Sequence, residues 1–457
     1  MPTDHAVTPW KAGVSRRIIT PPPHVELAGL GYYLNRTSER VADDLAATAL
    51  VIEDRWGQSV AIVAIDLMYC EESFTRNIRY RASSQTGIPP HAICVNCSHS
   101  HNAPTAGFIR GAGEINPEYL ADVVTHAVEA ITEAWQRRQP AVLRAGSAEV
   151  DGLTINRTRE NGPVDRRLGV LRVDTPDGAP LAVAINFHSH LTAHFEQNMR
   201  AVSRDWPGEL IDKLEAQLPG VTALYLQGTC GDVNLRPEFN NTHRSSEPAQ
   251  RLFEETIRAW THARLINGDT VKAVTSTVTL PTRRWQMEEI TKPREEALYR
   301  LQTGDTTDWL SGFAKVIVGV PERLPLRYGG SVAKAVAAAC RFMIEWSDSV
   351  LSDLQTRPEF FETEVQAIRL GDLWFAAHPS EMFTTTGLSI RKHWPHPDLF
   401  MLGYSNGSIG YLPDACEAER KSYAAYQSPK FTGQFPFTAQ SSDVMVEGIL
   451  AALKETC

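Results

Sequence analysis

The sequence lacks several features that mark common functional classes. It has 45 Lys and Arg against 54 Asp and Glu, and its net charge of −9 comes without a basic stripe, so we expect no nucleic-acid partner. It has no uncharged apolar run of about 18 residues, so we predict no transmembrane segment. The first residues, MPTDHAVTPWKAG, contain no apolar core of a secretory signal. We therefore expect a cytoplasmic protein.

Cysteine is scarce and shows no disulfide pattern. The seven cysteines are scattered and odd in number, as is typical of reduced thiols. Cys94 and Cys97 have a CxxC spacing, but in a strand they point to opposite faces, and no second pair follows. We therefore favour ordinary core cysteines over a zinc or redox site at this position.

The remaining composition is that of a soluble globular protein. Hydrophobic residues make up 42% of the chain and charged residues 22%. A length of 457 residues supports a large core and fits one big domain or two to three smaller ones.

One order of elements is predicted three times along the chain. Apolar, β-branched segments around Gly/Asp turns indicate β-hairpins at 47–66, 168–187 and 365–381. A helix, an apolar strand, an irregular loop and a second helix follow each hairpin. We predict the first helices at 73–84, 208–218 and 383–393, the strands at 93–101, 222–232 and 400–411, and the second helices at 116–135, 245–260 and 441–455.

This order predicts an α/β fold in which β-sheets are flanked by helices and built from three pseudo-repeated hairpin–helix–strand–helix units. The segment at about 285–350 falls outside the pattern and is predicted as a helical insertion. It forms either a lid or pocket wall, or a packing element. Polar residues gather after the strands, where α/β folds usually place their ligands.

Histidines and a carboxylate follow strands of all three units. The motif NCSHSHNAP contains His99 and His101, and NFHSHLTAH contains His188 and His190. We take the two HSH motifs to lie at equivalent places in two units, with Glu381 at the matching place in the third. Two imidazoles and one carboxylate form a set typical of catalytic zinc. A single histidine at a strand end is more often structural, so the pattern alone leaves both interpretations open.

A series of short motifs accompanies these elements along the chain. They are AGVSRRIITPP (12–22), SHSHNAP (98–104), INRT (155–158), NFHSHLT (186–192), VSRDWPGEL (202–210), QGTCGDVN (227–234), HPSEMF (378–383) and SNGSIGYLPD (405–414). Their order and spacing resemble the catalytic domain of the neutral/alkaline, non-lysosomal ceramidases. The resemblance covers nearly the whole chain apart from the helical insertion. It implies a single catalytic domain over 1–457, without the C-terminal immunoglobulin-like domain of that family.

The resemblance also implies a site. In that family two His, one Glu and one Tyr bind a zinc ion, and three further residues act in catalysis. The matching zinc ligands are His99, His190, Glu381 and Tyr411, and the matching catalytic residues are His101, Arg157 and Tyr423. His188 is expected to be a neighbour of the ligands. Asp66, Asp205 and Asp232 are either carboxylates that orient ligand histidines or structural caps.

The implied activity is zinc-dependent hydrolysis of a linear N-acyl amide by a metal-activated water, on a small-molecule or lipid-like amide. Arg157 or Tyr423 would stabilise the oxyanion, and His101 would pass a proton to the leaving amine. The family's HTHSGP is HSHNAP here, and Leu191 replaces its Pro after the second ligand histidine, so the substrate does not follow from the resemblance.

Two alternatives stay open. One is a zinc-dependent ester or lactone hydrolase, or an acyl transferase, on a non-ceramide substrate. The other is a metal- or ligand-binding homologue without turnover. The sequence leaves the oligomeric state open.

Overall fold

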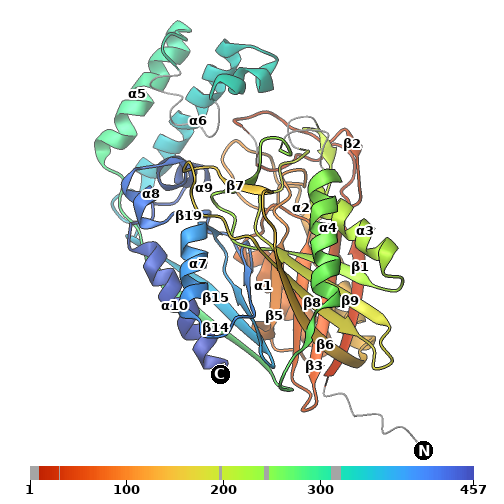
Figure 1. Cartoon of the computed structure of the whole chain (residues 1–457). Coiled ribbons are helices and arrows are strands. Elements are labelled where there is room, and N and C mark those ends of the chain that lie inside the picture. Colours follow the sequence, from red (N-terminus) through yellow and green to blue (C-terminus); the bar gives the residue numbers. More distant parts are fainter. Residues whose placement is uncertain (1–9, 30, 195–197, 241–245, 310–320) are drawn as a thin grey trace, which may run out of the picture.

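The computed structural model describes residues 10–29, 31–194, 198–240, 246–309 and 321–457. Two β-sheets form the centre of the molecule, with helices on their outer faces (Figure 1). In the larger sheet the order is β11-β9-β8-β6-β1-β3-β4-β5, with β13 beside β6. The smaller sheet has the order β14-β15-β16-β18.

The strands of the larger sheet are β1 (Trp10–Ile18), β3 (Ala46–Asp54), β4 (Ser59–Ile65), β5 (Ile93–Cys97), β6 (Gln139–Glu149), β8 (Arg167–Asp174), β9 (Pro180–Phe187), β11 (Thr222–Gln227) and β13 (Arg264–Leu265). Those of the smaller sheet are β14 (Val271–Pro281), β15 (Phe360–Leu370), β16 (Leu373–Ala377) and β18 (Leu399–Leu402). Short strands pair as β2 (Arg40–Val41) with β10 (Ala201–Val202), β7 (Thr154–Asn156) with β12 (Val233–Leu235), and β17 (Glu381–Met382) with β19 (Tyr411–Leu412).

The helices are α1 (Glu72–Thr86), α2 (Pro117–Gln136), α3 (Trp206–Gln217), α4 (Ser246–Thr261), α5 (Met287–Thr303), α6 (Val332–Asp353), α7 (Thr384–His393), α8 (Ala415–Glu419), α9 (Ser428–Thr432) and α10 (Ser441–Glu455). Short 3-10 segments are η1 (Pro90–Ala92) and η3 (Pro321–Tyr328), and η4 (Tyr423–Gln427) is one turn of π-helix.

Strand pairing follows one scheme in three stretches of the chain. The hairpins β3–β4, β8–β9 and β15–β16 are antiparallel, and their second strands pair in parallel with β5, β11 and β18. The predicted α/β fold is confirmed, and the predicted hairpins and helices form close to their expected positions. The later strands begin where we predicted but end earlier, at Cys97, Gln227 and Leu402. The first strand of each hairpin also pairs with a strand that we did not predict: β1 pairs with β3, β6 with β8, and β14 with β15. That the three stretches are copies of one unit stays a prediction.

Close helix–strand contacts cover both sheets. Helix α2 packs on β1 and β3, α4 on β6 and β8, and α10 on β14 and β15 (Figure 1). A Cβ at Gly13 would lie 2.0 Å from the carbonyl oxygen of Ala134, and one at Gly146 would lie 2.3 Å from that of Ala259. These two strand positions therefore require glycine for the helix to approach so closely.

The buried side chain of Asn96 joins strands from both sheets. Its Nδ2 donates to the carbonyl oxygen of Gly403 (2.6 Å) and to Ser405 Oγ (3.0 Å), and its Oδ1 accepts from the backbone N–H of Gln227 (2.8 Å). Asn96 lies on β5, Gln227 ends β11, and Gly403 follows β18. The carboxyl ends of the parallel-paired strands therefore meet at one place, because a single amide satisfies backbone groups from all of them.

The predicted helical insertion is confirmed by α5, η3 and α6, which project beyond the carboxyl ends of the strands (Figure 1). It has its own apolar cluster, which includes Trp285, Trp346 and Phe342 and packs against Tyr32 and Phe435. Residues 310–320 of the segment lie outside the described residues. Among the described helices, none is long and apolar enough to cross a membrane.

Candidate metal centre

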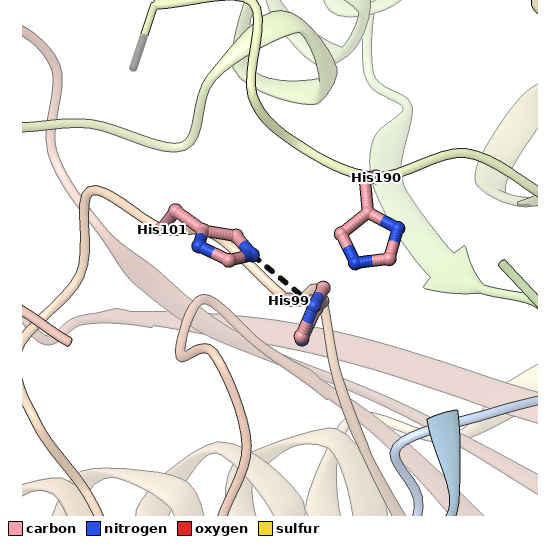
Figure 2. A group of neighbouring side chains, drawn as sticks. All are labelled: His99, His101 and His190. Atoms are coloured by element: carbon pink, nitrogen blue, oxygen red, sulfur yellow. Dashed lines mark hydrogen bonds between the residues drawn. The ribbon is translucent and has the colours of Figure 1, made fainter. Parts of the chain in front are cut away.

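The two HSH motifs lie side by side but are not equivalent in the fold. His99 follows β5, the strand that pairs in parallel with the first hairpin. His190 instead follows β9, which is the second strand of the second hairpin. Our expectation that the two HSH motifs occupy equivalent places is therefore wrong, whereas Glu381, which follows the second hairpin strand β16, does match His190. The motifs meet because the end of the parallel-paired strand β5 lies beside the end of the hairpin strand β9. A parallel bridge joins Ser100 to Leu191. Figure 2 shows His99, His101 and His190 grouped by this convergence.

Backbone carbonyls determine the tautomers of these histidines. Nδ1 of His99 lies 2.8 Å from the carbonyl oxygen of Met68, and Nδ1 of His190 lies 3.1 Å from that of Val233. Nδ1 of His101 lies 3.3 Å from the carbonyl oxygen of Gly29. A carbonyl oxygen only accepts hydrogen bonds, so each Nδ1 carries the hydrogen and each Nε2 keeps its lone pair.

The lone pairs converge on one buried place. Glu381 Oε2 lies 3.5 Å from His99 Nε2 and 3.4 Å from His190 Nε2, and His101 Nε2 lies 3.2 Å from His99 Nε2. His190 Nε2 has no hydrogen-bond partner among the described residues. The ligand atoms of the three histidines lie within 4.8 Å of one another. The three Nε2 lone pairs and the Glu381 carboxylate are acceptors that face one another, and a cation stabilises such an arrangement, so these residues fit a metal ion.

The three imidazoles are in the form that binds metals. Burial lowers the pKa of His99, His101 and His190 well below the ordinary value of 6.5. At His99 the carboxylate of Glu381 opposes this shift, whereas the nearby charge of Arg157 adds to it at the other two. Neutral imidazole is the metal-binding species.

Glu381 and Tyr411 are held beside each other by backbone pairing. They are partners in the parallel bridge of β17 with β19, and the N–H of Glu381 donates to the carbonyl oxygen of Gly410 (2.9 Å). Arg157 Nη2 donates to Tyr411 Oη (2.7 Å) and to the carbonyl oxygen of Gly231 (2.8 Å). The predicted Arg157, Glu381 and Tyr411 thus lie in one connected group.

Tyr423 joins this group from the other side. It begins the π-helical turn η4, and its ring meets that of Tyr411 edge-on at a centroid distance of 5.8 Å. Single π-turns are frequent at functional sites. Burial raises the pKa of Tyr423 above its ordinary value of 10, so the phenol retains a hydrogen to donate at neutral pH.

The three aspartates do not orient the histidines. Asp66 accepts from the N–H of Ala46 (2.9 Å), and Asp205 accepts from the N–H of Trp206 (2.6 Å) at the start of α3. Asp232 accepts from the N–H of Thr384 (2.8 Å). Of our two alternatives, structural capping is therefore the one observed, and backbone carbonyls take the place of the orienting carboxylates.

His188 and the CxxC cysteines lie outside the centre. His188 is bound by Thr229, Asp165 and Arg391 rather than by any of the predicted ligands. Cys94 and Cys97 are buried free thiols, as expected.

One residue at the centre escaped the sequence analysis. The ring of Tyr404 stacks on that of His99 with centroids 4.0 Å apart, and its hydroxyl lies 3.5 Å from Glu381 Oε2. It stands in the irregular loop after β18, where a tyrosine carries no motif signal. Its place follows only from the meeting of β5 with the segment after β18.

Comparison with known proteins shows which solved structures share this fold. No protein-family model matches the chain, and no curated protein matches it. A neutral ceramidase from Pseudomonas aeruginosa has a TM-score of 0.72 and 16% identity over 98% of this chain and 75% of that one. A ceramidase complexed with C2 has a TM-score of 0.71 and 16% identity over 98% and 76%. The chain therefore has the fold of neutral ceramidase, as its motifs implied.

Proposed function

We propose that this protein is a zinc-dependent hydrolase that cleaves a linear N-acyl amide bond. The observation that carries the proposal is the buried convergence of three Nε2 lone pairs and the Glu381 carboxylate. Nitrogen and carboxylate ligands of this kind are typical of catalytic zinc sites with an open position. The fold of neutral ceramidase supports the choice of an amide as the bond that is cleaved.

The proposed zinc ligands are His99, His190, Glu381 and Tyr411. His101 lies close enough to compete as a ligand, because its Nε2 is 3.2 Å from that of His99. We assign it to proton transfer because the resemblance places it outside the ligand set. Substitution of His101 distinguishes these roles, because loss of a ligand releases the metal, whereas loss of a proton carrier does not.

When bound, zinc lowers the pKa of a coordinated water to about 7 and polarises a carbonyl. The neutral His101 has a lone pair with which to accept a proton and then hand it to the leaving nitrogen. Tyr423 and Arg157 donate hydrogen bonds to the substrate oxygen as negative charge develops there, each contributing about 3 kcal/mol. Although burial disfavours its charge, Tyr411 and Glu381 raise the pKa of Arg157, which stays a cation throughout.

The proposed substrate is a small-molecule or lipid-like amide, and a two-part experiment tests the proposal. Protein purified without chelators is analysed for metals and then assayed on a panel of N-acyl amides and their matched esters of varied chain length. We expect about one zinc per chain and cleavage of N-acyl amides. Absence of zinc binding would overturn the proposal.

The other outcomes separate the alternatives. Cleavage of esters or lactones alone would identify an ester hydrolase, and acyl transfer to an added amine would identify a transferase. Zinc binding without turnover on the whole panel would identify a binding homologue.

A further inference from the structure

Tyr404 contacts two of the proposed ligands, one from each sheet. Its ring lies at 29° to that of His99 with centroids 4.0 Å apart. Its hydroxyl lies 3.5 Å from Glu381 Oε2, the same oxygen that faces His99 Nε2 and His190 Nε2. His99 follows β5 of the larger sheet, and Glu381 follows β16 of the smaller one. A single side chain therefore contacts one proposed ligand from the larger sheet and one from the smaller sheet.

The backbone at both stacked residues is in the left-handed region. His99 has φ 68° and Tyr404 has φ 51°. This conformation costs a residue with a bulky side chain about 1–2 kcal/mol, and such strain persists only where surrounding contacts enforce it. The carbonyl oxygen of Tyr404 accepts from the N–H of Cys97 (3.1 Å), two residues before His99. The two strained residues are thus fixed against each other by backbone as well as by ring contact.

A buried thiol gives the Tyr404 hydroxyl its direction. Cys230 Sγ lies 3.1 Å from Tyr404 Oη. Burial raises the pKa of Cys230, so its thiol keeps a hydrogen at neutral pH. A carboxylate only accepts hydrogen bonds, so the hydroxyl donates to Glu381 and is left to accept from Cys230. The chain of hydrogen bonds therefore runs in one direction, from Cys230 through Tyr404 to Glu381.

We infer that Tyr404 is a positioning residue that holds His99 and Glu381 in the geometry that binds the metal, with Cys230 orienting its hydroxyl. The inference rests on the proposed function, because it requires a metal at this centre. The stacked ring limits rotation of the His99 imidazole, and the hydroxyl holds one carboxylate oxygen toward the histidine lone pairs. Neighbours of this kind typically change metal affinity 10- to 100-fold, roughly, when they are removed.

The experiment measures the zinc dissociation constant by competition with a chromogenic chelator. Tyr404→Phe removes the hydroxyl and keeps the ring, and we expect about tenfold weaker binding. Tyr404→Leu also removes the stacked ring, and we expect about a hundredfold weakening. Cys230→Ala keeps the contacts of Tyr404 with His99 and Glu381, and we expect zinc binding to weaken only roughly threefold.

Tyr119→Phe is the matched control. Tyr119 on α2 is also buried, but its hydroxyl donates to the backbone carbonyl of Ile19 (2.8 Å). We expect this variant to lower the melting temperature and to leave the zinc dissociation constant unchanged. Tyr404→Phe should instead weaken zinc binding and leave the melting temperature of the metal-free protein unchanged.

Two results would overturn the inference. Zinc binding by the unaltered protein together with an unchanged constant for Tyr404→Phe would remove the positioning role and leave the proposed function standing. Absence of zinc binding by the unaltered protein would remove both.

Discussion

His188 and His190 lie two residues apart in one motif and are both fully buried, yet their surroundings differ. Nδ1 of His188 accepts from the N–H of Thr229 (2.9 Å), and its Nε2 lies 3.4 Å from Asp165 Oδ2. Because Nδ1 accepts, Nε2 carries the hydrogen and donates toward Asp165, although Arg391 Nη2, which is also a donor, lies 3.2 Å from it. His190 instead donates from Nδ1 to the carbonyl oxygen of Val233, and its Nε2 faces the carboxylate of Glu381.

The difference teaches how to separate a structural histidine from a ligand. Burial lowers the pKa of both, to about 4 for His188 and well below 6.5 for His190, so the protonation state does not distinguish them. Complementarity does, because a matched ring is already satisfied, whereas a lone pair that meets other acceptors requires a cation.

Glu381→Ala should have the largest effect. Loss of the carboxylate removes the only carboxylate ligand that we propose, so zinc affinity should fall more than about a hundredfold and amide cleavage should be lost. Metal content and kcat/KM measure the two effects. Glu71→Ala is the control, because that carboxylate accepts from the backbone N–H of Phe108 (2.9 Å) instead. Full zinc content in Glu381→Ala would contradict the ligand set.

His190→Gln and His188→Gln form a matched pair within the motif. The first should weaken zinc binding about a hundredfold and destabilise the metal-free protein less than the second, because it removes an unsatisfied lone pair and only one hydrogen bond, to Val233. The second should keep zinc but lower the free energy of unfolding by about 2–3 kcal/mol, because Thr229 and Asp165 lose their partner. Zinc titration and urea unfolding check both. The reverse pattern would break the comparison.

His101→Gln should affect turnover rather than metal binding. We expect kcat to fall about a hundredfold, as is usual when a general acid or base is removed, with a zinc dissociation constant within roughly threefold of the original. His99→Gln, measured in parallel, should release the metal. If His101→Gln released zinc and His99→Gln retained it, the two roles would be exchanged.

Asp66→Asn should have the smallest effect and should depend on pH. Burial raises the pKa of Asp66 from 3.8 to about 6. Between these values the folded state binds more protons than the unfolded state, so stability falls as pH rises from about 4 to 6, by up to roughly 3 kcal/mol. Urea unfolding at several pH values should show a shallower fall for Asp66→Asn. Identical slopes would mean that neighbouring groups fully compensate the burial of this carboxylate.

The elements and the chemical groups were predictable from the sequence. Hairpins, helices and the helical insertion follow from local periodicity and turn residues, which act over a few neighbours. The additional strands β6 and β14 were missed because apolar and polar residues alternate only weakly in their sequences, as in "QPAVLRAGSAE", although the burial of β6 does alternate in the fold. The residue types of a metal site were also visible, because imidazoles and a carboxylate after strands are few and distinctive.

What the sequence by itself determined is therefore an α/β chain with histidines and a carboxylate at strand ends. The tertiary structure alone decided which of these meet. Asn96 ties the ends of β5, β11 and the segment after β18, and this closure places His99 beside His190 and Glu381 while His188 lies apart. The physical reason is range: periodicity is local, whereas the meeting of lone pairs depends on contacts between residues about three hundred positions apart.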